Sequence, residues 1–182
     1  MTSPIMGDSM FRAMLSTSAL MHRKSDGGTS SADQQSHGHD DMSTVVIPMH
    51  KSSEETVRLI QILGTLPENT WAWSMLELWG TGIAPQGMTM QSFEDYVSSS
   101  DAGYQLGWRE LVSTASSLDQ VHDCLIAATR SPFALTRPSL DQASNPELLV
   151  VIEALDSTEW GIRIGDHLDD AREIKERLAS LR

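Results

Sequence analysis

Apolar residues along most of this chain recur at helical spacing rather than in strict alternation. The spacing i, i+3, i+4, i+7 gathers apolar side chains on one face of a helix and so predicts a succession of helices. The expected helices span residues 54–64, 65–79, 90–97, 104–115, 117–128, 145–155 and 166–181. We therefore expect a mainly α fold, in which a compact multi-helix domain occupies residues 44–182.

Three of the expected helices begin with a recognisable sequence signal. Residues 65–68 (TLPE), 117–120 (SLDQ) and 144–147 (SNPE) each place a hydroxyl side chain three positions before Glu or Gln. That is the spacing of a capping box, in which the two side chains satisfy backbone N–H groups at a helix start. Proline in the first turn of two of these segments strengthens the prediction.

Two short segments instead have the pattern of strands. The run from Thr44 to Ile47 is β-prone and stops at Pro48, while Trp160, Ile162 and Ile164 alternate with smaller or polar residues. We expect a small β element from Thr44 to Ile47 and from Trp160 to Ile164. An alternative pairs residues 149–154 with the second strand as a hairpin, but their apolar spacing and the preceding proline favour a helix there.

Residues 1–43 are expected to form a disordered tail. They are rich in Ser, Met, Gly, Asp and Gln, and residues 25–41 contain no large apolar side chain. Such a segment buries too little surface to offset the entropy lost on ordering. The stretch 10–25 is basic, hydroxyl-rich and free of acidic residues, so export or organelle targeting through the tail is an alternative to a cytoplasmic location.

The charge balance narrows the classes of partner. The chain holds 25 acidic residues against 13 Lys and Arg, for a formal net charge of −12. Phosphate backbones and anionic lipid surfaces are bound by clusters of cations, so neither nucleic acid nor membrane is an expected partner. A basic protein partner fits the acidity, which also favours solubility. A single cysteine and the lack of a long apolar run fit a cytoplasmic protein.

No residue pattern identifies a catalytic centre, a metal site or a cofactor. His122 precedes Cys124 by two positions. Residues two apart on a helix point in nearly opposite directions, so His122 could not act as a base for the Cys124 thiol. Cys124 also shares a predicted apolar face with Val121 and Leu125, where a cysteine acts as a small hydrophobe. The His and Asp cluster at residues 37–41 lies in the expected tail, which would hold no preformed metal geometry.

A cluster of tryptophans gives the best candidate for a binding surface. On a helical wheel Trp73 falls beside Glu77 and outside the apolar face that holds Trp79. Trp73 therefore either packs under the loop from Gly80 to Met88 or anchors a partner. The predicted partner-binding residues are Trp73, Glu77, Trp79 and Met88, and the amphipathic C-terminal helix is a second candidate surface.

These observations favour a non-enzymatic interaction module, such as a regulator, an adaptor or a chaperone-like protein that binds another protein. The alternative is an enzyme with an uncommon site near the loop from Gly80 to Met88, using His122 or Glu77. The two differ in geometry, since an enzyme needs a concave pocket with convergent polar groups.

Overall fold

One antiparallel sheet organises the part of the chain that the computed structural model describes, residues 42–52, 55–131, 135, 140, 145–155 and 157–182. These residues belong to one compact unit, 38–182. The sheet has six strands in the order β1-β6-β5-β4-β2-β3. The strands are β1 (Met42–Pro48), β2 (Ala72–Gly82), β3 (Tyr104–Leu106), β4 (Leu118–Thr129), β5 (Leu148–Leu155) and β6 (Glu159–Gly165). The tail predicted for residues 1–43 falls almost wholly outside the described residues.

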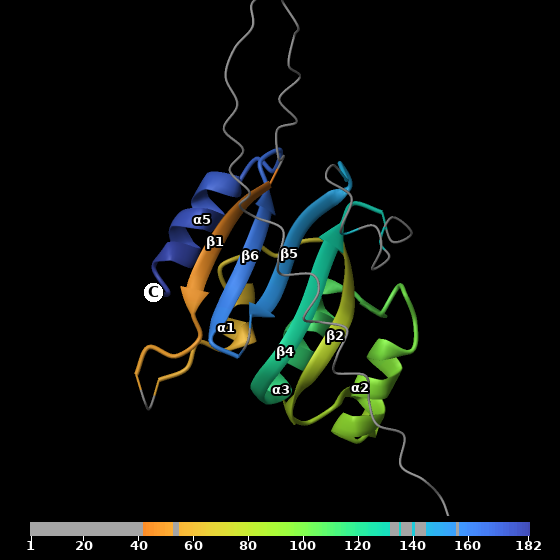
Figure 1. Ribbon diagram of the computed structural model, residues 1–182. Coiled ribbons are helices and arrows are strands. Elements are labelled where there is room, and N and C mark those ends of the chain that lie inside the picture. Colours follow the sequence, from red (N-terminus) through yellow and green to blue (C-terminus); the bar gives the residue numbers. More distant parts are fainter. Residues whose placement is uncertain (1–41, 53–54, 132–134, 136–139, 141–144, 156) are drawn as a thin grey trace, which may run out of the picture. The chain divides into compact units, whose positions relative to one another are not determined.

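Helices pack against one face of this sheet. They are α1 (Leu59–Leu63), α2 (Met90–Ser98), α3 (Trp108–Ser117) and α5 (Ala171–Ala179), with a 3-10 turn, η2 (Pro85–Gly87), between β2 and α2. In Figure 1, α1 and α3 lie behind the sheet, and α5 runs along β1. The opposite face of the sheet looks toward the reader.

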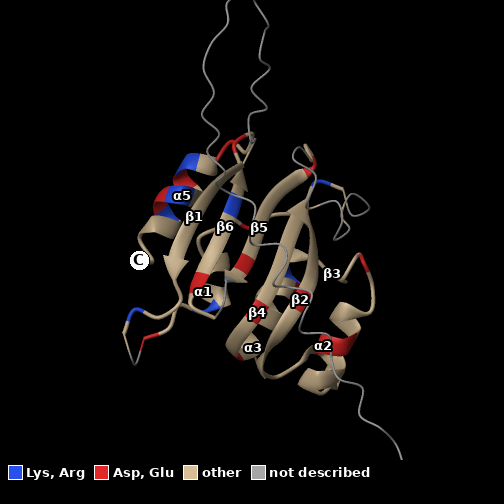
Figure 2. Ribbon diagram, in the orientation of Figure 1, with Lys and Arg blue, Asp and Glu red and all other residues tan. Residues whose placement is uncertain are grey.

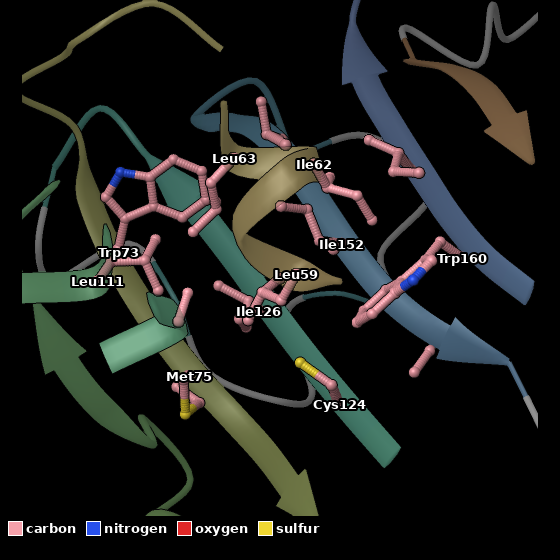
Figure 3. Close-up of a cluster of buried hydrophobic side chains, with 14 of the residues drawn as sticks. Leu59, Ile62, Leu63, Trp73, Met75, Leu111, Cys124, Ile126, Ile152 and Trp160 are labelled. Carbon is pink, nitrogen blue, oxygen red and sulfur yellow. The ribbon is translucent and has the colours of Figure 1, made fainter. Parts of the chain in front are cut away.

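The main hydrophobic core fills the space between the sheet and the helices. Figure 3 shows Trp73, Ile126, Ile152 and Trp160 of the strands meeting Leu59 and Leu111 of α1 and α3, all at most 1% exposed. Both tryptophans keep their ring N–H groups satisfied: Trp160 Nε1 donates to the carbonyl of Val57 at 2.8 Å, and Trp73 Nε1 donates to Asn69 Oδ1 at 3.0 Å. Burying such large side chains supplies most of the driving force for this packing.

Both free edges of the sheet carry features that hinder further strand pairing. On β1 the carbonyl of Val46 accepts a bond from Arg182 Nε at 3.2 Å, and Pro48, two residues on, has no N–H to offer. At the other edge β3 covers only the first part of β2. Beyond it, the backbone N–H of Gly80 donates to Glu94 Oε1 of α2 at 3.0 Å.

The mainly α prediction is wrong, because 39% of the described residues are in strands and 29% are helical. Three expected helices, over residues 65–79, 117–128 and 145–155, are largely the strands β2, β4 and β5. The expected helix over residues 54–64 shrinks to α1, and the one over 104–115 divides into β3 and α3.

Inserted residues explain why β2 and β4 look helical in sequence. Leu76 is an extra residue in β2, between the pairs Met75↔Ile126 and Glu77↔Leu125. In β4, Asp119 and His122 are inserted in the same way. Each β-bulge lengthens the spacing of core-facing residues from two to three, and a spacing of three is also that of a helix face. Leu118, Val121 and Cys124 are spaced in this way.

Burial on both faces explains β5. Residues 148–152 are all buried, so this part of the sequence lacks the alternation of apolar and polar residues that would indicate a strand. The expected capping box before it is a turn instead, in which the N–H of Glu147 donates to Asn145 Oδ1 at 3.1 Å. The alternative hairpin is the observed arrangement, with Ile152 opposite Ile162.

Four predicted elements are confirmed. The two short strands lie within β1 and β6 and pair with each other, with Val45 opposite Ile162. The helices expected at residues 90–97 and 166–181 are α2 and α5. β1, α2 and α5 each have one buried and one solvated side. In β6 most residues are buried, but large apolar residues still alternate with glycine and arginine, so its pattern is that of a strand.

Candidate functional site

The face of the sheet turned away from the helices is the candidate functional site. We call it the open face and define it by three rows of residues that neighbour one another across the strands. The first row is Ser74, Ala127, Val151, Arg163 and Thr44, and the second is Glu77, Leu125, Glu153, Gly161 and Val46. The third row consists of two pairs, Trp79 with Asp123 and Glu159 with Pro48, and β5 runs between them. Their immediate neighbours along the strands, such as Leu78, Cys124 and Ile162, point to the helices.

Part of the open face is covered by a second, smaller core. Leu76, Ala127 and Val151 of the sheet pack there with Leu135 and Leu140 from the connection between β4 and β5. Leu125 is half-buried at the border of this cluster. In the next row Glu77, Leu125 and Glu153 are half-buried and Gly161 is buried. The exposed large apolar side chains of the described open face are Val46 at the end of that row and Trp79 beyond it.

Trp79 is the most conspicuous residue of the open face. Its side chain is 60% exposed, whereas Trp73 of the same strand is 1% exposed. The bulge at Leu76 causes the difference: the two tryptophans are six residues apart and would share a face in a regular strand. The extra residue reverses the alternation and turns Trp79 outward.

His122 lies beside Trp79 on the open face. The two ring centroids are 4.9 Å apart, and the rings are tilted by 46°. His122 is itself an inserted residue of β4, and its carbonyl accepts a 2.7 Å bond from Ser157 Oγ of the β5–β6 turn. Opposite the bulge, Gly80 approaches so closely that a Cβ atom there would lie 2.4 Å from the carbonyl oxygen of Gln120. Two bulges and a glycine therefore position this aromatic pair.

Acidic side chains dominate the rest of the open face. Glu77, Asp123, Glu153 and Glu159 contribute four carboxylates, against the single guanidinium of Arg163. In Figure 2 the red bands on β2, β4, β5 and β6 lie toward the lower half of the sheet, and the blue band on β6 lies above them. Glu77 and Glu153 flank Leu125 from either side, since both are its register partners.

The residues predicted to bind a partner lie at different depths. Trp73 is buried on the helix side, where its ring lies 5.9 Å from that of Trp71 and 5.8 Å from that of Trp108. Glu77 and Trp79 lie together on the open face. Met88 is half-buried against the main core, so it does not lie on the open face with Glu77 and Trp79. The segment from Gly80 to Met88 is partly strand and partly the turn η2.

Cys124 is buried and unreactive. It is 0% exposed and projects into the main core beside Ile126 and Trp160 (Figure 3). Burial raises the pKa of its thiol far above the usual range, and the nearby carboxylates of Glu77 and Glu153 raise it further. A thiol held neutral in this way is not a nucleophile. The interpretation of Cys124 as a small core residue is confirmed.

A hollow in the described part of the chain lies on the helix side of the sheet, away from the open face. It is lined by Thr56, Arg58, Asp119 and Gln120 together with apolar residues such as Val57 and Trp160, and its lining includes neither Glu77 nor His122. Among the described residues, no group of three His, Cys, Asp or Glu side chains could hold a metal ion. The predicted weak cluster at residues 37–41 lies outside them. Within the same residues no helix is long and apolar enough to cross a membrane.

Comparison with protein-family models, with curated proteins and with solved structures finds no match. The candidate site therefore depends on geometry alone. Sequence reasoning missed most of it, because Asp123, Leu125, Glu153 and Glu159 come together only when β2, β4, β5 and β6 pair. The available signal was the alternation of residues 159–165, which places Glu159, Gly161 and Arg163 on one face.

Proposed function

We propose that this protein is a non-enzymatic interaction module that binds another protein through the open face of its sheet. The observation that carries the proposal is the exposure of Trp79, which is 60% accessible and is turned to the open face by the bulge in its own strand. Bulges that re-aim a side chain are typical of functional positions. Tryptophan is also one of the side chains enriched among the residues that dominate binding energy at interfaces.

The surroundings of Trp79 support a protein partner rather than a small substrate. Trp79 contacts the ring of His122 and is paired across the strands with Asp123, so an exposed aromatic side chain has polar neighbours, as at the centre of many protein–protein interfaces. Small-molecule sites are instead concave. The excess of carboxylates on the same face disfavours a phosphate-bearing partner.

The experiment is a quantitative affinity capture from native extract with the full chain and with Trp79→Ala. We expect the captured partner to fall by about thirtyfold or more, since truncating a central tryptophan typically costs at least 2 kcal/mol of binding. Ile83→Ala is the matched control, because Ile83 is 74% exposed and lies just after β2, outside the open face. It should retain the partner.

Stability must be measured in parallel. Trp79→Ala should change the free energy of unfolding by less than about 0.5 kcal/mol, whereas Trp73→Ala should cost about 3–5 kcal/mol because it empties the core. Unchanged capture by Trp79→Ala, with folding intact, would refute the proposal.

A further inference from the structure

We infer that the partner segment bound by the open face carries two arginines about 10 Å apart on either side of an apolar side chain. This inference rests on the proposed function and adds the chemistry of the partner. It starts from the middle row of the open face, in which Glu153 and Glu77 stand on either side of Leu125.

Sheet geometry fixes the spacing. Neighbouring strands lie about 4.8 Å apart, so the backbones of Glu77 and Glu153, two strands from each other, are separated by about 10 Å. Side chains in one row project from the same face, and Leu125 lies between the two carboxylates. An apolar side chain that contacts Leu125 would therefore bring its two neighbouring cations to Glu77 and Glu153.

Charge complementarity gives the sign of the partner. Asp123 and Glu159 add to Glu77 and Glu153, and Arg163 is the one cation in the three rows. A second acidic surface, including that of another copy with a net charge of −12, would be repelled.

Arginine fits this surface better than lysine. Its planar guanidinium can bond both oxygens of a carboxylate and can also stack on an aromatic face. Trp79 is one row from Glu77 on the same strand, so a guanidinium paired with Glu77 is within reach of the exposed indole.

The test uses the full chain and a capped, helix-forming peptide with two arginines seven residues apart, a rise of about 10 Å, and a leucine between them on the same face. Its dissociation constant is measured by fluorescence anisotropy at low and at moderate salt. We expect Glu77→Gln and Glu153→Gln each to weaken binding about tenfold, since each removes a charge-assisted hydrogen bond. Two variants are used so that a folding defect in one leaves the other informative.

Matched controls separate a specific site from general acidity. Glu173→Gln makes the same change on α5, outside the open face, and should leave the affinity within twofold. A lysine version of the peptide should bind more weakly, and a glutamate version should not bind. Glu77→Arg should recover binding to a peptide in which one arginine is replaced by glutamate.

Several results would overturn the inference. Equal binding of the arginine and glutamate peptides would do so, as would an equal loss with Glu173→Gln. Self-association of the protein that Trp79→Ala abolishes would assign the open face to a second copy instead. If partner capture depends on Trp79 but not on Glu77 or Glu153, this inference fails and the proposed function stands. If Trp79→Ala also leaves partner capture unchanged, both this inference and the proposed function fail.

Discussion

At the scale of single residues, Cys124 shows how burial decides chemistry. Its sulfur lies in the main core, and its pKa is raised first by desolvation and then by the carboxylates of Glu77 and Glu153. Because the folded pKa exceeds the unfolded one, the thiol contributes stability that is complete below the unfolded pKa and is lost as the pH rises above it.

This gives a prediction about alkaline stability. An unfolded thiol titrates at a pKa of about 8.5, so wild-type protein should lose about 2 kcal/mol more unfolding free energy than Cys124→Ala between about pH 8 and pH 10. Urea titrations under reducing conditions measure it. The alanine variant starts less stable because of its cavity, but that cost does not depend on pH. Parallel pH profiles for the two proteins would contradict the prediction.

At the scale of elements, β2 is positioned by glycines where other strands or turns approach closely. Gly103 adopts a φ of +66° in the turn between α2 and β3. A Cβ atom on it would lie 2.2 Å from the carbonyl oxygen of Met75 and 2.9 Å from the Cα of Leu76. The residue at this turn must therefore be glycine for β3 to pair with β2 next to the bulge that orients Trp79.

Replacing Gly103 tests this role. Gly103→Ala should lower the free energy of unfolding by about 1–3 kcal/mol, because it combines a left-handed backbone with a clash against the backbone of β2. Gly64→Ala is the control, since Gly64 has a helical φ of −63° and its nearest atoms would be 3.4 Å away. That variant should be neutral or slightly stabilised. A loss of equal size in both would argue against the proposed cause.

At the scale of the whole molecule, contacts between distant parts of the chain complete the sheet. Strand β1 pairs with β6, and Ser43 Oγ donates to Asp166 Oδ1, 123 positions away, at 2.5 Å. Lys175 Nζ of α5 donates to both of these groups, at 3.0 Å and 2.8 Å. These bonds keep the pKa of Asp166 below its usual value.

Such topology predicts slow folding. Pairing β1 with β6 requires closure of a long loop before its contacts stabilise the fold, so refolding should take milliseconds to seconds rather than microseconds. Stopped-flow tryptophan fluorescence on dilution from urea measures the rate, because Trp73 and Trp160 become buried. Complete recovery of the signal within the dead time would disprove it.

The sequence alone determined those elements whose two sides face different surroundings. β1 and the amphipathic helices α2 and α5 each have a solvated side, and their periodicity follows from it. In β6 the periodicity comes from large apolar residues on the core face that alternate with Glu159, Gly161 and Arg163 on the open face. The acidity of the chain and the inert character of Cys124 were also evident from the residues.

Only the tertiary structure decided the central strands and the open face. In β2 and β4 the insertions at Leu76, Asp119 and His122 are defined by pairing with a neighbouring strand, so their three-residue spacing cannot be distinguished from a helix within one segment. In β5 both faces are covered by other elements, which removes the alternation. Because a bulge also sets which face a side chain occupies, pairing is what buries Trp73 and exposes Trp79.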